Sequence, residues 1–261
     1  FCSPYSQLYD PQELPLHQNF SIDARSENSL LRKVDTSWFD GDEKDIRNTM
    51  AQHYGMISHI DDNVGRVVDF LKEKDIYENT VIVFMADHGE YMGSHHLLTK
   101  MPWPWEELLR IPYIWKVPEG YKSSCEELVS ILDFAPTILD FAGIDEKELQ
   151  FNKKEAYSNE YSLPGRSLKN YLKDGKKFKT KGVYNEAGNK RTLVKDQYKL
   201  YVNASNSDNN LLVDLKNDPH EKINLWNEEE YKDIKEKMLV ELLNDNIRHG
   251  RVDNPDITDG A

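Results

Sequence analysis

The sequence contains only two cysteines among its 261 residues, Cys2 and Cys125. Neither belongs to a C-x-x-C pair or lies near histidines at the spacing of a zinc site. The sequence therefore predicts neither a disulfide framework nor a zinc knuckle. The two thiols assign no redox compartment, and the first residues contain no recognisable leader, so the localisation stays open.

Basic residues are few relative to acidic ones. There are 33 Lys and Arg against 46 Asp and Glu, which gives a formal net charge of -13. A field of this sign repels phosphate backbones and anionic lipid surfaces. Long apolar runs are also missing, because the longest, residues 81–86, is far below the roughly 20 residues that cross a bilayer. We therefore expect neither nucleic acid nor a membrane as a partner.

Hydrophobic periodicity indicates the elements of an α/β domain. Apolar residues recur at steps of three and four over residues 44–74, which predicts one long amphipathic helix. The run at residues 81–86 is rich in β-branched residues and predicts a strand buried on both faces, inside a parallel sheet. Further strands are predicted at residues 113–117 and 128–132. A helix is predicted at residues 137–142, with Asp133 as its cap, Pro136 in its first turn and Gly143 at its end.

The predicted strands are too few to complete a parallel sheet. A strand that is apolar on both faces needs parallel neighbours, and each neighbour needs a crossover connection. The chain supplies too few of these connections. We expect the main sheet to be half present, with the remaining strands in a preceding segment. The alternative is a three-strand α/β domain that is complete in itself.

The second part of the chain has a different pattern. Residues 150–181 are polar and predict a linking loop. Short β-type runs then alternate with turns at residues 182–186, 191–194, 198–202 and 211–214, which predicts an antiparallel meander. A final helix is predicted from Asn227, capped with Glu230, and its apolar stripe contains Tyr231, Ile234, Met238 and Leu242. The predicted domains are residues 1–181 and residues 182–261.

Asp87 and His88 are the strongest candidates for functional-site residues. They directly follow the strand predicted at residues 81–86, and open α/β sheets form their sites at the carboxyl ends of strands. A carboxylate and an imidazole together can bind a divalent cation, and Gly89 permits a sharp turn after them. The residues alone leave a second interpretation open, in which Asp87 caps the next helix and His88 only contacts a loop.

The order of short motifs resembles that of a known enzyme family. Residues 53–112 are similar to the second half of a type I sulfatase, a formylglycine-dependent member of the alkaline phosphatase superfamily. The motifs are Gly65-Arg66-Val67, Asn79-Thr80, Asp87-His88-Gly89-Glu90, Gly93-Ser94-His95, Lys100, Trp105-Glu106-Glu107 and Arg110-Ile111-Pro112. Later segments also resemble the family: Asp133-Phe134-Ala135-Pro136-Thr137, Gly165-Arg166-Ser167-Leu168, Asn217-Asp218-Pro219 and Asn224-Leu225.

The resemblance implies a fold and an activity. The fold is an alkaline-phosphatase-like α/β sandwich with a partial central sheet, followed by a small C-terminal antiparallel sheet with a packed helix. The activity is hydrolysis of a small-molecule or carbohydrate sulfate ester with one divalent cation and a formylglycine. The Cys/Ser-x-Pro/Ala-x-Arg motif that becomes formylglycine is present at neither Cys2 nor Cys125. We therefore expect the nucleophile in a missing N-terminal half, and we expect the isolated chain to be inactive.

Residue roles follow from the positions that match the family motifs. Asp87 and His88 would bind the cation, which the resemblance gives as Ca²⁺. The imidazole suits Mn²⁺ or Zn²⁺ equally well, and Mg²⁺ is a further alternative. Lys100 matches the lysine that contacts the sulfate, unless it is a solvated surface residue. His95 matches a pocket histidine, and Trp105 either stacks on a sugar or aryl ring or packs in the interior.

Two other functions remain open at this point. Phosphonate monoester and phosphodiester hydrolases share the scaffold and the Asp-His pair, and a non-catalytic module derived from a sulfatase would share the fold alone. The natural substrate depends on loops that vary in sequence, and neither it nor the oligomeric state is indicated.

Overall fold

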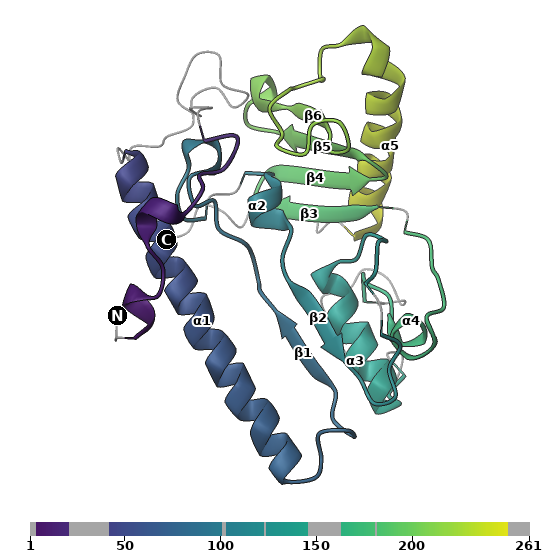
Figure 1. Cartoon of the computed structure of the whole chain (residues 1–261). Helices are drawn as coiled ribbons and strands as arrows, with labels where there is room; N and C mark the ends of the chain where they lie inside the picture. Colours follow the sequence, from purple (N-terminus) through teal and green to yellow (C-terminus); the bar gives the residue numbers. More distant parts are fainter. Residues whose placement is uncertain are drawn as a thin grey trace, which may run out of the picture. The chain divides into compact units, whose positions relative to one another are not determined.

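The chain forms two compact units (Figure 1), which are described separately. The computed structural model describes residues 4–20, 42–100, 103–122, 124–145, 163–180 and 182–249. The first unit comprises Phe1–Ser124, Asn170–Phe178 and Asp218–Ile223, and the second comprises Cys125–Lys169, Lys179–Asn217 and Asn224–Ala261. The division predicted at residue 181 stays a prediction. Within the described ranges, no helix combines the length and the apolarity that a bilayer span requires.

The longest element of the first unit is α1 (Glu43–Glu73), which confirms the predicted long helix. It begins with a capping box, because the side chains of Asp42 and Asp45 each accept a hydrogen bond from the other's backbone N–H. Its first turns and its middle pack against an N-terminal arm that contains two short 3-10 turns, η1 (Tyr5–Gln7) and η2 (Pro11–Glu13). Figure 1 shows this arm beside the start of the helix.

The contact between the arm and α1 is a small hydrophobic core. Ile46 and Met50 of the helix are buried with Leu14 of the arm. Two tyrosines of the arm also contact side chains of the helix. The Tyr5 hydroxyl donates a hydrogen bond to the Asp62 carboxylate at 2.5 Å, and the Tyr9 hydroxyl lies 2.9 Å from the Ser58 hydroxyl. The hydrogen bond to the Asp62 carboxylate is the main reason why the pKa of Tyr5 is raised.

The rest of α1 presents an apolar stripe to solvent. Five large side chains of the helix are between 41% and 57% exposed: Met56, Ile57, Ile60, Val67 and Phe70. Their spacing of three, four and seven residues places them on one side of the helix. Gly65 lies on another side of the helix in an open environment, since a Cβ at this position would meet no atom within 4 Å. Exposed apolar stripes of this kind are typical of interaction surfaces.

The two strands of the first unit correct one prediction. β1 (Ile82–Met85) and β2 (Tyr113–Lys116) lie at the predicted positions, but they pair antiparallel, with Ile82 opposite Lys116 and Met85 opposite Tyr113. In the described residues of the connection between them, the only α-helix is the short α2 (Glu106–Leu109), which is too short for the crossover helix that a parallel neighbour needs. β1 is also not buried on both faces in the described part of the chain, because Phe84 is 37% exposed and Ile114 of β2 is 62% exposed.

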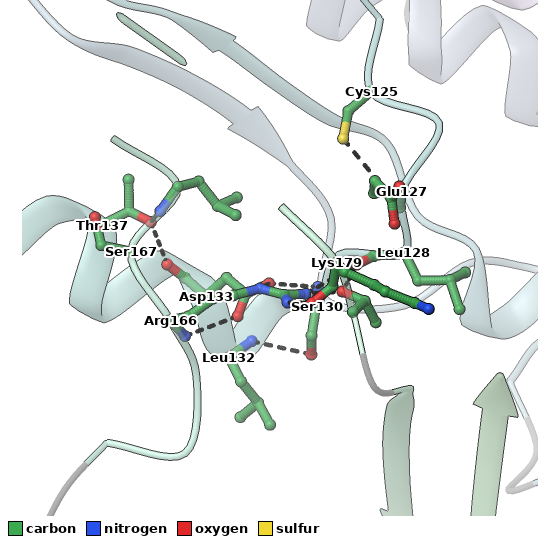
Figure 2. Close-up of polar contacts among 12 residues, drawn as sticks. Cys125, Glu127, Leu128, Ser130, Leu132, Asp133, Thr137, Arg166, Ser167 and Lys179 are labelled. Atoms are coloured by element: carbon green, nitrogen blue, oxygen red, sulfur yellow. Dashed lines mark hydrogen bonds and ion pairs between the residues drawn. The ribbon is translucent and has the colours of Figure 1, made fainter. Parts of the chain in front are cut away.

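The strand predicted at residues 128–132 of the second unit is wrong. Residues 131–133 form a 3-10 turn, η4 (Ile131–Asp133), which begins with a capping box between Ser130 and Asp133. The carbonyl oxygen of Leu128 accepts side-chain hydrogen bonds from Arg166 at 3.1 Å and from Thr180 at 2.7 Å, instead of bonds from a neighbouring strand. Figure 2 shows Arg166 between Asp133 and the Leu128 segment. Local side-chain bonds therefore replace a strand ladder here.

The helix after this turn is where the sequence predicts it. α3 (Phe134–Ala142) ends at Gly143, whose φ of 71° is the left-handed conformation of a C-cap glycine. Asp133 lies at the N-cap position, but its carboxylate accepts hydrogen bonds from the backbone N–H groups of Ser130 and Arg166 rather than from the helix. The loop predicted at residues 150–181 is partly wrong, because α4 (Lys169–Asp174) lies within it. Residues 150–162 and 181 of that prediction lie outside the described residues.

The antiparallel meander and its covering helix are confirmed. The sheet has the strand order β3-β4-β5-β6, formed by Val183–Ala187, Lys190–Lys195, Tyr198–Asn203 and Leu211–Asp214. The 3-10 turn η6 (Ser207–Asn209) precedes β6. The last helix begins later than predicted, at the turn η7 (Glu229–Tyr231), and continues as α5 (Lys232–His249). Met238 and Leu242 of α5 pack on Leu193, Leu200 and Leu212 of the sheet.

We expect Met238→Ala to lower the free energy of unfolding by about 2–5 kcal/mol, because it leaves a cavity between α5 and the sheet. The matched control is Val240→Ala on the same helix, where the side chain is 57% exposed against 4% for Met238. Urea unfolding, followed by tryptophan fluorescence, measures both. Equal losses for the two variants would contradict the packing of α5 on this sheet.

Candidate functional site

Asp87 and His88 lie side by side immediately after β1. The distance between Asp87 Oδ2 and His88 Nε2 is 3.7 Å, and the backbone N–H of His88 donates to Asp87 Oδ1 at 3.0 Å. Both side chains are accessible, with 84% of the Asp87 side chain and 35% of the His88 side chain exposed. No helix begins at Asp87, since the next helical turn, η3 (Ser94–His96), starts after Gly93. The structure thus brings the two predicted cation ligands together, and their role as ligands stays a prediction.

The imidazole of His88 is held by the adjacent backbone. His88 Nδ1 lies 2.8 Å from the carbonyl oxygen of Gly89. When Nδ1 carries the proton, it donates to this carbonyl and leaves the lone pair on Nε2, the nitrogen nearer the Asp87 carboxylate. Fixing one ring nitrogen in this way is how proteins orient a metal-binding histidine.

Gly89 connects the Asp-His pair to α2. Its N–H donates to the carbonyl oxygen of Leu108 at 2.8 Å. A Cβ on this residue would lie 1.9 Å from the carbonyl oxygen of Glu107, well inside van der Waals contact. Only glycine allows the backbone after His88 to approach α2 this closely.

The loop that leads to Lys100 is tightly folded and strained. Met92, His95, His96 and Thr99 have positive φ values between 46° and 61°, each of which costs about 1 kcal/mol or more for a side chain other than glycine. Backbone hydrogen bonds close the loop, including Gly93 N–H to Leu97 O at 2.8 Å. Lys100 lies exposed at its end and makes no hydrogen bond or ion pair with the residues that the structure describes.

His95 and Trp105 are packed against each other beneath this loop. Their rings are stacked, with centroids 3.9 Å apart and an interplanar angle of 11°. Both residues are 1% exposed, so in the described part of the chain they support the loop rather than line an open surface. Their predicted contact with substrate stays a prediction.

Two residues near the site carried no signal in the sequence. Asn19, which is fully buried, donates from Nδ2 to the Glu107 carboxylate at 3.3 Å and to the His220 carbonyl at 3.2 Å. The carboxylate of Glu221 accepts a hydrogen bond from the backbone N–H of Glu106 at 2.7 Å. Both lie in polar, aperiodic segments, and only the match of residues 217–219 to a family signature pointed near them.

A cavity of about 520 Å³ lies in the second unit and contains none of the predicted site residues. Its lining includes Asp140, which accepts hydrogen bonds from Ser167 at 2.6 Å and from Lys169 at 3.0 Å. The bond from Ser167 is the main cause that lowers the pKa of the Asp140 carboxyl group. Over the described ranges, no three or more His, Cys, Asp or Glu side chains cluster as a metal site. Asp87 and His88 therefore account for two ligands only.

Comparison with protein families gives two overlapping matches. The model described as "Sulfatase" matches residues 7–144. The model described as "N-sulphoglucosamine sulphohydrolase, C-terminal" matches residues 93–248. Together they cover nearly all of the chain that the structure describes.

Individual proteins agree with these matches. An arylsulfatase of Clostridium perfringens (strain 13 / Type A) is 28% identical over 92% of this chain and 49% of its own length. The uncharacterized sulfatase YidJ of Escherichia coli (strain K12) is 31% identical over 72% of this chain and 37% of its own length. The crystal structure of a phosphonate monoester hydrolase of Agrobacterium radiobacter has the same fold, with a TM-score of 0.72 at 19% identity, over 95% of this chain and 54% of that one. The chain thus spans about half, or less, of the length of the proteins it matches.

We expect Gly89→Ala to destabilise the protein by about 1–3 kcal/mol, because the added methyl group collides with the backbone of α2. Gly65→Ala is the control, and it should instead stabilise α1 by up to about 1 kcal/mol, since nothing opposes a Cβ there. Urea unfolding of the two variants gives both values. A neutral Gly89→Ala would contradict the close approach of the Asp-His segment to α2.

Proposed function

We propose, since the chain belongs to the sulfatase family and has the fold of alkaline-phosphatase-like enzymes, that it forms the C-terminal part of a sulfate-ester hydrolase. The observation that carries the proposal is the contact between the side chains of Asp87 and His88 at the end of β1. The substrate class is a small-molecule or carbohydrate sulfate ester.

Asp87 and His88 would hold a divalent cation. A carboxylate oxygen and an imidazole nitrogen 3.7 Å apart, both accessible and with the ring oriented by Gly89, fit two ligands of one ion. Ca²⁺ is the first candidate for the family, and the nitrogen donor keeps Mn²⁺, Zn²⁺ and Mg²⁺ as alternatives. When bound, such an ion supplies Lewis-acid polarisation of a sulfate oxygen. The remaining ligands and the formylglycine nucleophile are assigned to an N-terminal half.

Lys100 would bind the sulfate group. Its ammonium group is exposed, and the loop before it is fixed by the buried pair His95 and Trp105. A positive charge held on a rigid loop stabilises the negative charge that builds up on the sulfate and on the leaving oxygen. His95 and Trp105 contribute to the substrate site by shaping this loop.

A second candidate is a phosphonate monoester or phosphodiester hydrolase, which is favoured by the shared fold with the Agrobacterium enzyme. The two candidate enzymes differ in the ester that they cleave faster, a sulfate ester or a phosphonate or phosphate ester. Rates on an aryl sulfate and on an aryl phosphonate monoester, measured with the full-length polypeptide, separate them, and faster cleavage of the phosphonate would reject the first choice. Cleavage of neither ester, with the nucleophile motif absent upstream, would indicate a non-catalytic module.

Asp87→Asn and Lys100→Met should each lower kcat/KM for an aryl sulfate by about 10²–10³-fold in the full-length protein, because each removes a charge that acts on the sulfate group or its cation. Lys122→Met is the control, since Lys122 is another exposed lysine of the same unit. Steady-state kinetics give the three ratios. Unchanged turnover in Asp87→Asn would overturn the proposed cation site.

The exposed apolar surfaces of the first unit would receive the N-terminal half. The stripe on α1 and the side chains of Phe84 and Ile114 on the sheet are large, apolar and exposed. In a complete domain, such side chains would normally be covered. The relatives that the chain matches are at least twice as long as the matched part. The occupant we propose is therefore the preceding segment of the same polypeptide, which would supply the nucleophile.

Val67→Asp should weaken binding of the N-terminal half, supplied as a separate chain, by about tenfold or more, because it places a charge in the apolar stripe. Lys72→Glu serves as the control, since Lys72 is exposed and lies roughly 140° away around α1. Calorimetric titration of the two chains measures both affinities. Equal binding by Val67→Asp and the wild type would show that the stripe is not the docking surface.

A further inference from the structure

Glu221 is a buried acidic residue with no role in the mechanism so far. It is 1% exposed and has a φ of 52°, which is unfavourable for glutamate. It belongs to Asp218–Ile223, a short segment that is part of the first unit although its neighbours in sequence belong to the second. Burial of a carboxylate is tolerated only where hydrogen bonds compensate for lost water.

Part of the compensation comes from α2. Glu221 Oε2 accepts the backbone N–H of Glu106, the first residue of this helix, at 2.7 Å. The N-cap residue, Trp105, makes no side-chain capping bond. Glu221 therefore supplies, from a distant part of the sequence, an acceptor for one of the N–H groups that the start of a helix leaves without an intrahelical partner.

Asn19 ties the same two segments together. Its Nδ2 donates to Glu107 of α2 and to the carbonyl oxygen of His220, next to Glu221. The arm, α2 and Asp218–Ile223 thus meet at one buried set of polar contacts. This set fixes where α2 starts.

A continuous series of contacts connects this set to His88. The carbonyl oxygen of Leu108, in α2, accepts the N–H of Gly89 at 2.8 Å. The carbonyl oxygen of Gly89 in turn lies 2.8 Å from His88 Nδ1. A displacement of α2 would move Gly89, and with it the group that orients the imidazole.

We infer that Glu221 is a positioning residue for the Asp87–His88 pair, acting through α2 and Gly89. The inference rests on the proposed function in one respect, since it concerns the same cation site. It adds a residue that touches neither the cation nor the substrate, about 130 positions away in the sequence.

The test compares Glu221→Ala, Glu221→Asp and Glu221→Gln in the full-length protein. Two quantities are measured: Ca²⁺ affinity by calorimetry, and hydrogen exchange at the Gly89 amide without metal. The Ala variant loses the acceptor oxygen, and the shorter Asp side chain withdraws it from the Glu106 amide. Both variants should therefore weaken Ca²⁺ binding by about tenfold or more and speed hydrogen exchange at the Gly89 amide. The Gln variant keeps an acceptor oxygen and should stay close to wild type in both.

Asp214→Ala is the control for a general loss of stability. Asp214 is also buried and accepts several hydrogen bonds, but it belongs to the second unit. It should lower the melting temperature without changing Ca²⁺ affinity or exchange at Gly89. If Glu221→Ala does not fold, Glu221→Asp decides. Wild-type values in the Asp variant, or equal changes in Asp214→Ala, would overturn the inference.

The outcomes also separate this inference from the proposed function. Ca²⁺ binding by the wild type without aryl sulfate turnover would reject the sulfatase activity and leave the role of Glu221 to be judged by affinity. No Ca²⁺ binding by the wild type would reject the proposed cation. Exchange at Gly89 in the Asp and Gln variants would then decide whether Glu221 holds the segment.

Discussion

The geometry of the candidate site depends on how closely the backbone at Gly89 approaches α2. The segment between β1 and this point is short, and it is fixed at both ends. Met85 is paired with Tyr113 of β2, and the N–H of Gly89 donates to the carbonyl oxygen of Leu108. Asp87 and His88 therefore project from a backbone with little freedom to move. A carboxylate and an imidazole held in this way would lose little entropy on binding the proposed ion.

The two units solve the problem of burying apolar surface to different extents. In the second unit, α5 covers one face of the β3–β6 sheet, and Leu193, Leu200 and Leu212 are completely buried. In the first unit, the β1–β2 pair and most of α1 still expose large apolar side chains. α1 is more strongly amphipathic than α5, so the difference lies in what is available to cover each apolar face. This is the expected condition of a chain that spans about half of its relatives.

Sequence reasoning located the elements whose signal is periodic. It found α1, the four-stranded meander and the stripe of α5, because their side chains repeat with the period of a helix or a strand. It failed where the structure of a segment depends on which other segments of the chain it contacts. The run at residues 81–86 indicates burial but not the direction of the neighbouring strand, and β2 pairs with it antiparallel. At residues 128–132, Ser130 and Asp133 bond to the local backbone, which a strand would not allow. For the site, adjacency in sequence placed Asp87 beside His88, whereas Glu221 and Asn19 act through contacts over long sequence separations that no local pattern contains.

The loop before Lys100 shows how buried contacts support an exposed functional group. Four left-handed residues in one loop persist only when the surroundings fix the backbone more strongly than the strain opposes it. The stacked pair His95 and Trp105, and the hydrogen bond from the Tyr91 hydroxyl to the carbonyl oxygen of Trp103 at 3.1 Å, supply that constraint beneath the loop. Because the interior holds the loop, Lys100 does not need a partner of its own to stay in place. Its ammonium group can then remain available for an anionic group, which is the property that a sulfate-binding lysine requires.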